Sequence, residues 1–379
     1  MADSVTDIST TLEAPAKGSR LFARTGLIGL TLVAILALMA AAGVRYGLLL
    51  AIGVGFGLTL EGLRFGFAGP WRAMILRREP AGLIAQLLAI GLVAIVTFPL
   101  LSGDHPELIG AHAAVGWSMV GGAFVFGAAM QLLLGCGSGT LVNAGSGNPV
   151  SVVALPFFVV GAFAGSYHLL WWTDLGHLPL VVLEGSRGLV ITLLGLLIVG
   201  LGAFSLAPRQ ARFVPRRLLV AAVLLAALAI ANFAVAGQPW GVVYGLGLWA
   251  AKGASALGAD LTASSYWASP VHQERLAASL LTDYTSLTNL GIILGAFIVA
   301  VWRSGLSTRL PSLPARAWLA TVIAGFLLGY SSRLALGCNV GAFFSGISTG
   351  SLHGWVWFVA AFAGAWVGIR LRKPLGLEG

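Results

Sequence analysis

The two cysteines of this chain, Cys136 and Cys338, stand in matching surroundings and have the side chains best suited to chemistry. Each follows an apolar run and lies among glycines, in LGCGSG at 134–139 and LGCNVG at 336–341. A thiol is a soft group that donates or accepts a hydrogen bond, and glycine lets backbone N–H groups approach a bound ion. A half-helix that begins there would point its N-terminal N–H groups at an anion. The pattern predicts a conduit for a soft anion, formed by Cys136, Cys338, Gly135, Gly137, Gly139, Gly337, Gly341 and Asn339.

Simple packing is the competing explanation for these thiols, because cysteine is a common buried small residue. That explanation would suffice for one Gly-Cys run, whereas two equivalent runs favour a site. Charges near membrane depth are candidates for balancing an anion, namely Arg333, Lys252, Arg64 and Arg72. Anchoring at the cytoplasmic surface explains Arg64 and Arg72 equally well, and Arg333 can snorkel to an interface.

An enzymatic alternative comes from GISTG at 346–350, which fits the G-x-S-x-G pattern of serine hydrolases. The pattern is short, its strand-to-helix context is missing, and the chain is rich in glycine and serine. An intramembrane serine hydrolase is therefore an alternative with little support. The paired thiols and the internal repeat described below also argue against a purely structural role.

The composition indicates a membrane protein. Apolar residues make up 58% of the 379 residues and charged residues only 9%, with a mean hydropathy of +0.92. Soluble domains carry about 25% charged residues, so this chain lacks the charge to cover a water-facing surface. The net charge of +9 fits the Lys and Arg excess of cytoplasmic loops, and no basic stripe with aromatics indicates nucleic acid. The sequence has no CxxC pair, metal cluster or G-x-x-x-x-G-K-[ST] motif, so we expect no cofactor, no metal and no use of ATP.

Apolar segments of membrane-spanning length predict an all-α, polytopic fold. Residues 1–20 are polar and predict a disordered cytoplasmic tail, and 21–43 predict a retained first membrane helix rather than a signal peptide. The other segments lie near 46–63, 83–101, 113–134, 150–171, 188–206, 217–236, 240–258, 286–302, 317–336 and 351–370.

Arginines cluster in the loops at 64–82, 207–217 and 303–316, which predicts that these loops are cytoplasmic. Full crossing by every segment would place 303–316 outside, against this bias. We therefore expect the glycine-rich segment 240–258, which carries Lys252, not to cross fully.

The surroundings of the two cysteines belong to an internal repeat. At an offset of 202 positions the matches are Phe124/Phe326, Gly127/Gly329, Leu132/Leu334, Leu134/Leu336, Gly135/Gly337, Cys136/Cys338, Gly139/Gly341 and Ser146/Ser348. The sequence AFAG also occurs at both 162–165 and 361–364. On the predicted topology 113–134 runs inward and 317–336 outward. The halves 21–206 and 207–379 are thus predicted to be inverted repeats, with the site at their interface near the midplane.

These motifs resemble the YeeE/YedE sulphur-transport family of bacterial inner-membrane proteins. The likeness covers most of residues 46–370, through RLALGCNVGAFFSGI with SLHGW behind it, GCGSGTLVNAGSG, and LRFGFAGPWRAM. The resemblance implies uptake of a sulphur-containing ion, best known as thiosulphate, along cysteines of a narrow, hourglass-shaped conduit. Where the family's RFC-type motif has cysteine, this chain has Gly66, so the cysteine roles carry over only to Cys136 and Cys338.

The sequence therefore predicts a multi-pass transporter of the bacterial inner membrane for a soft sulphur anion, most simply thiosulphate. A selenium compound or another sulphur oxyanion is the alternative substrate. Membrane lipid and a cytoplasmic sulphur-carrier or sulphurtransferase protein are the other expected partners. Gly66 joins the conduit residues as the position of the missing third thiol.

Overall fold

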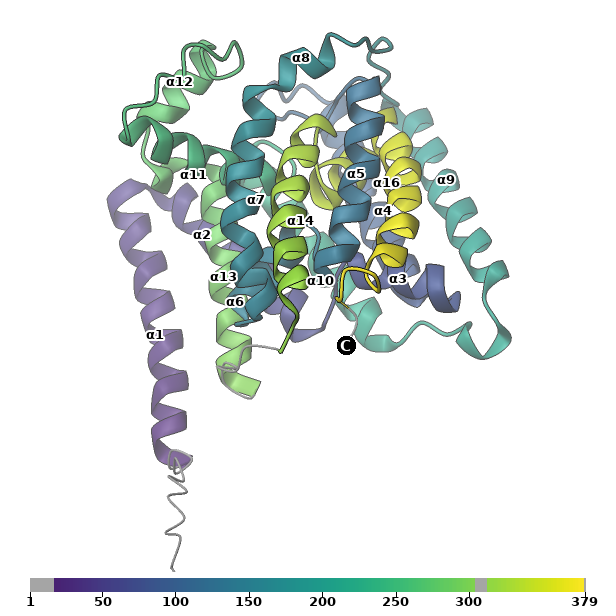
Figure 1. The fold of residues 1–379 in the computed structure, drawn as a ribbon, viewed down its shortest axis with the longest axis horizontal. Coiled ribbons are helices and arrows are strands. Elements are labelled where there is room, and N and C mark those ends of the chain that lie inside the picture. Colours follow the sequence, from purple (N-terminus) through teal and green to yellow (C-terminus); the bar gives the residue numbers. More distant parts are fainter. Residues whose placement is uncertain (1–16, 304–311, 378–379) are drawn as a thin grey trace, which may run out of the picture.

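The protein is mainly helical in the part of the chain that its computed structural model describes, residues 17–303 and 312–377 (Figure 1). Apart from the helices, these residues form only two isolated β-bridges, Gly116 with His177 and Val182 with Ser351. Ten helical segments among them are long and apolar enough to cross a membrane. The predicted all-α, polytopic membrane fold is confirmed.

The spanning helices follow the predicted apolar segments closely. They are α1 (Lys17–Ala42), α2 (Val44–Gly62), α4 (Ala81–Ser102), α5 (Trp117–Leu133) with α6 (Gly137–Gly145), α7 (Pro149–Tyr167), α9 (Gly185–Leu206), α10 (Arg216–Ala236), α13 (Tyr284–Arg303), α14 (Ala315–Leu334) with η3 (Asn339–Phe344) and α15 (Ser345–Ser348), and α16 (Leu352–Leu371). Shorter helices lie between them: α3 (Ala68–Arg77), α8 (Leu169–Thr173), η1 (Arg209–Ala211), α11 (Val243–Ala256), α12 (Pro270–Ala277) and η2 (Leu280–Thr282).

Two boundaries bear on the sequence predictions. Helix α1 begins at Lys17, so the predicted tail ends earlier than residue 20, and residues 1–16 lie outside the described part. Helix α11 has 14 residues. At about 1.5 Å per residue such a helix is shorter than the roughly 30 Å hydrocarbon core. This length agrees with the prediction that 240–258 does not cross fully.

The arginine-rich connections gather at one face of the bundle. Helices α2, α9 and α13 end there and α4, α10 and α14 begin there, at the lower side of Figure 1, where the C-terminus also lies. Arg303 at the end of α13 donates a hydrogen bond of 3.1 Å to the Glu61 carbonyl near the end of α2. We call this side the basic face and the other the opposite face. That the basic face is cytoplasmic stays a prediction, and Arg309 lies outside the described residues.

Close helix contacts hold the two predicted halves together. Gly127 of α5 lies so near α16 that a Cβ atom there would be 2.7 Å from the Ala361 carbonyl carbon. Gly329 of α14 approaches α7 equally closely, since its Cβ would be 2.5 Å from the Ala162 nitrogen. Glycine permits such backbone approach between membrane helices. Both glycines and both alanines occupy matching positions of the sequence repeat, so α5 with α16 and α14 with α7 are equivalent pairs.

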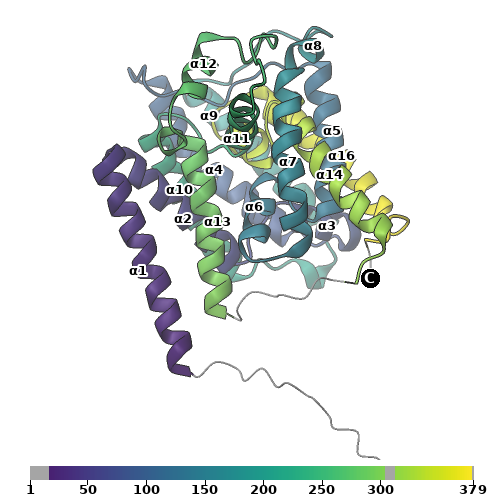
Figure 2. The same cartoon turned by 60° about the vertical axis from the view of Figure 1, so that its left-hand side comes forward.

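Helices α5 and α14 run in opposite directions. The Ser118 hydroxyl at the start of α5 donates a hydrogen bond of 3.1 Å to the carbonyl of Leu334 at the end of α14. This arrangement agrees with an inverted repeat, although the inversion of the complete halves 21–206 and 207–379 stays a prediction. Helix α1 stands at the edge of the bundle beside α2 and α13 (Figure 2).

Candidate functional site

Two sharp chain reversals position the cysteines. Leu134, after α5, has φ 53°, and Leu336, after α14, has φ 56°. A leucine in the left-handed region is an uncommon conformation that costs on the order of 1–3 kcal/mol, and such residues cluster at functional sites. The two leucines are equivalent in the repeat. Each one directly precedes a Gly-Cys pair and ends the long helix, so that the chain turns back into the bundle.

Cys136 caps the N-terminus of α6. Its Sγ accepts a hydrogen bond of 3.4 Å from the Gly139 N–H and lies 3.5 Å from the Ser138 hydroxyl. The thiol is buried, and it lines a cavity of about 360 Å³ together with Gly66 and Arg64. Because Arg64 follows the end of α2, this basic-face cavity opens toward the basic face. The predicted residues Gly135 and Gly139 also line it.

Cys338 occupies the equivalent place ahead of η3 and is also buried. It lines a second cavity, of about 540 Å³, together with Gly337, Gly341 and Arg333. Arg333 is in the last turn of α14, which ends toward the opposite face, so we call this the opposite-face cavity. Each cysteine therefore lines a cavity at a different face of the helix bundle.

Two polar side chains near Cys338 have no hydrogen-bond partner among the described residues. Both amide atoms of Asn339 are buried and unpaired, and so is the indole nitrogen of Trp240, which lines the opposite-face cavity. A buried unpaired donor costs about 1–3 kcal/mol. The indole nitrogen of Trp240 is therefore suited to a polar or charged ligand, whereas the predicted residue Asn339 lies outside the lining of both cysteine cavities.

The two cavities approach each other at the start of α6. A Cβ atom on Gly137 would lie 3.0 Å from the Sγ of Cys338, so the N-terminus of α6 packs directly on the second thiol. Aromatic rings close the rest of the gap. Phe344 contacts Phe67 of the basic-face cavity and Trp240 of the opposite-face cavity, with ring centroids 6.4 Å and 5.8 Å apart. The arrangement is two cavities separated by a thin constriction that carries the thiols.

The four charge candidates divide into two groups. Arg333 and Arg64 line the opposite-face and basic-face cavities, respectively. Lys252 instead donates to the carbonyls of Leu276 and Ala278, at 2.6 Å and 2.5 Å, and ties α11 to the C-terminal end of α12. Arg72 lies on α3, outside the lining of the basic-face cavity. Of these four predicted residues, the structure therefore brings two, Arg333 and Arg64, to the cysteine cavities.

Three residues that were not among the predicted site residues lie in the same cavity as Arg333. Arg275 and His272, both on α12, line the opposite-face cavity, and so does Tyr244 of α11. Arg275 is 3.1 Å from the carboxylate of Asp283. Burial lowers the pKa of His272 to about 4, helped by the charges of Arg333 and Arg275. Burial also raises the pKa of Tyr244.

The GISTG pattern has no hydrolase geometry. Ser348 lies in the short helix α15, where its hydroxyl is 3.3 Å from the Ser345 carbonyl. The nearby His353 lies 2.7 Å from the hydroxyl of Ser351 instead. A nucleophile elbow needs a strand-to-helix turn that exposes its serine, and Ser348 is buried.

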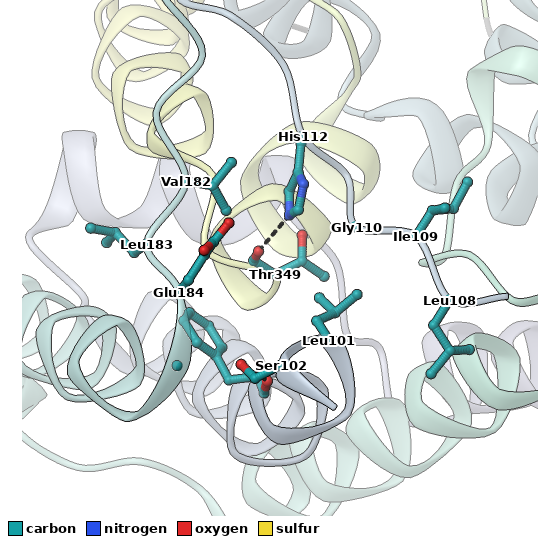
Figure 3. A pocket seen from close by; sticks show the side chains of 12 residues that line it. Leu101, Ser102, Leu108, Ile109, Gly110, His112, Val182, Leu183, Glu184 and Thr349 are labelled. Carbon is teal, nitrogen blue, oxygen red and sulfur yellow. Dashed lines mark hydrogen bonds between the residues drawn. The ribbon is translucent and has the colours of Figure 1, made fainter. Parts of the chain in front are cut away.

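A cavity of about 700 Å³ at the opposite face contains neither cysteine (Figure 3). It is lined by His112, Glu184 and Thr349, and the His112 Nε2 lies 2.9 Å from the Thr349 carbonyl. Gly110 and His112 also line the opposite-face cavity, so this segment forms the wall between the two hollows.

Comparison with known proteins identifies the family. A family model described as sulphur transport matches residues 63–367, which include both cysteine motifs and Gly66. The chain belongs to the sulphur transport family. The resemblance inferred from the Gly-Cys motifs is confirmed. With ten apolar helices in the described part of its chain, this family member is a multi-pass protein of the bacterial inner membrane.

Three curated relatives are similar to this member of the sulphur transport family. The thiosulfate transporter TsuA of Spirochaeta thermophila is 26% identical over 339 residues, which are 84% of this chain and 96% of TsuA. The probable transporter YedE of Escherichia coli is 39% identical over 95 residues, and that of Salmonella typhimurium is 31% identical over 138 residues. These two alignments cover 25% and 36% of this chain, and only 23% and 33% of the YedE proteins.

Proposed function

We propose that the protein carries thiosulphate across the membrane along Cys338 and Cys136. The observation that carries this proposal is the position of the two thiols, each in a cavity of a different face and separated only by the Gly137 contact. The likeness to a thiosulfate transporter over 84% of the chain supports the choice of substrate.

The chemistry of the constriction suits this ion. Thiosulphate carries a terminal sulphur and charged oxygens, so a thiol can donate to it without any bond being made or broken. Arg333 attracts the dianion into the opposite-face cavity, and Cys338 with the unpaired indole nitrogen of Trp240 receives it. Cys136 and the N-terminal end of α6 take it next. Arg64 lies at the exit.

The charge distribution supports uptake as the direction of transport. With the basic face in the cytoplasm, the ion enters past Arg333 and leaves past Gly66 and Arg64. A cytoplasmic sulphur-carrier or sulphurtransferase protein would receive it there. Single cysteines on the connections 64–82 and 207–217, in a chain lacking Cys136 and Cys338, test this orientation. If an impermeant thiol reagent labels these sites from outside intact cells, the basic face lies outside and the proposed order of the ion path is reversed.

Uptake of labelled thiosulphate into vesicles that contain the purified protein tests the function. We expect saturable uptake that excess sulphate inhibits weakly. Selenite and sulphite, added as competitors, measure the alternative substrates. Vesicles with folded, correctly inserted protein that take up no thiosulphate would refute the proposal, and strong uptake of selenite alone would assign the transporter to selenium.

A further inference from the structure

An apolar groove runs along the outside of the bundle between α4 and α9, in the half nearer the basic face. It has a volume of about 480 Å³ and is lined almost wholly by aliphatic side chains. On α4 it extends from Ile84 to Ile95, which is 11 residue steps or about 16 Å of helix. This length is about half of the roughly 30 Å hydrocarbon core. The groove therefore matches the depth of one lipid leaflet.

Glycines keep the groove open. Gly91 of α4 and Gly200 of α9 both line it. A Cβ atom on Gly200 would lie 3.7 Å from the Leu87 Cδ1, and one on Gly91 would lie 3.5 Å from the Leu193 Cδ2. These are ordinary contact distances, so a methyl group fits, whereas a longer side chain would fill the space. Helix α9 is otherwise sparsely covered, with 17% of its spanning window buried.

The basic-face end of the groove meets a cluster of positive charge. Phe204 closes the groove, and the Arg212 guanidinium lies 5.6 Å from its ring centre. Arg212 is held by hydrogen bonds of 3.1 Å to the carbonyls of Ser205 and Ala207. The exposed arginines of the same connection are Arg209, Arg212, Arg216 and Arg217. Among the described residues none of these forms an ion pair with a carboxylate.

We propose that this groove binds one acyl chain of an anionic phospholipid, whose phosphate is held by the arginine cluster. The apolar groove and the charge meet at the depth where a lipid of the basic-face leaflet changes from chain to headgroup. Basic pockets beside membrane helices on the cytoplasmic side select anionic lipids in this way. The bound chain would supply the packing that α9 lacks against α4, so the lipid acts as a structural partner of the transporter.

Native mass spectrometry of the full chain in detergent tests the site with dioleoyl phosphatidylglycerol, dioleoyl phosphatidylcholine and glycerol phosphate. We expect preferential retention of phosphatidylglycerol, with no displacement by glycerol phosphate, which has the headgroup charge but no chain. The double variant Arg216→Gln/Arg217→Gln should lose about fivefold in affinity for each arginine removed. The matched control Arg187→Gln removes an exposed charge from the other end of α9 and should retain the lipid.

Gly200→Leu tests the groove separately and should weaken retention of both phospholipids. The arginine variants change only exposed side chains, so they remain informative if Gly200→Leu fails to fold. Equal retention of the two phospholipids by the wild type would overturn the proposal. So would a double variant that behaves like Arg187→Gln, or displacement of the lipid by glycerol phosphate.

Discussion

Replacing Gly66 with cysteine would add a third thiol to the basic-face cavity that Cys136 already lines. The backbone is suited to the change. Gly66 is not among the positive-φ glycines, and a Cβ atom there meets no heavy atom within 4 Å. Its carbonyl accepts a hydrogen bond of 2.8 Å from Gln86, which a side chain would not disturb. A non-glycine residue at such a position leaves stability unchanged or raises it by about 0.4–1 kcal/mol.

The expected gain is in selectivity. The new thiol can donate to the terminal sulphur of thiosulphate, an acceptor that sulphate lacks. A net hydrogen bond contributes about 1 kcal/mol, which is about fivefold in relative affinity. We therefore expect Gly66→Cys to need about five times more sulphate for half-inhibition of thiosulphate uptake.

Competition curves in vesicles measure this change, with Gly66→Ala and Gly66→Ser as controls. The alanine variant adds only bulk, and the serine variant adds a hard hydroxyl of similar size, so neither should shift the preference toward thiosulphate. An unchanged curve in a well-expressed Gly66→Cys protein would mean that Gly66 does not face the ion path. Equal shifts in the cysteine and serine variants would refute the role of sulphur.

The remaining predictions concern the thiols, the helix contacts and pH. Cys136→Ala and Cys338→Ala should each abolish uptake of thiosulphate. Each should cost about 1 kcal/mol in the free energy of unfolding, so the melting temperature should stay near that of the wild type. Normal uptake by both variants would mean that the thiols only fill space in the core. Gly127→Ala should lower stability by about 1–3 kcal/mol, because its methyl group would collide with Ala361 of α16. Melting temperature measures this loss, and the control is Gly121→Ala, because a Cβ atom on Gly121 meets no heavy atom within 4 Å. The native pKa of His272, about 4, is below its unfolded value, so the unfolded state binds more protons and stability falls as pH drops from about 6.5 to 4. Amide exchange of α12 should report this loss, and His272→Gln should remove the pH dependence.

The sequence predicted the long helices because apolar runs of about 20 residues have few alternatives to spanning a membrane. The same logic does not detect α6, η3 and α15, which carry the site; a half-helix after each cysteine was expected from the Gly-Cys motifs instead. These segments are short and rich in glycine, serine and polar residues, a composition that also fits a loop. Their helical form depends on burial between the long helices, and periodicity does not report such burial.

The site was partly predictable for a related reason. The cysteines and their glycines were found because the repeat marks them twice, and both thiols do line cavities. His272 and Arg275 belong to a single unrepeated connection, which only tertiary packing brings beside Arg333. Lys252 is a different case. Its charge suggested an ion site, and in the structure its ammonium group donates hydrogen bonds to two backbone carbonyls.

The crossed pairing of α5 with α16 and of α14 with α7 limits how the protein can move. Many transporters with inverted repeats alternate access by rocking one half as a rigid body against the other. Here each such rotation would separate Gly127 from Ala361 and Gly329 from Ala162, where the backbones touch. We therefore expect the frame of long helices to stay closed during transport. The ion path would then open by movement of the short segments that carry the cysteines. The protein would pass ions one at a time through a gated constriction, while the long helices stay in place.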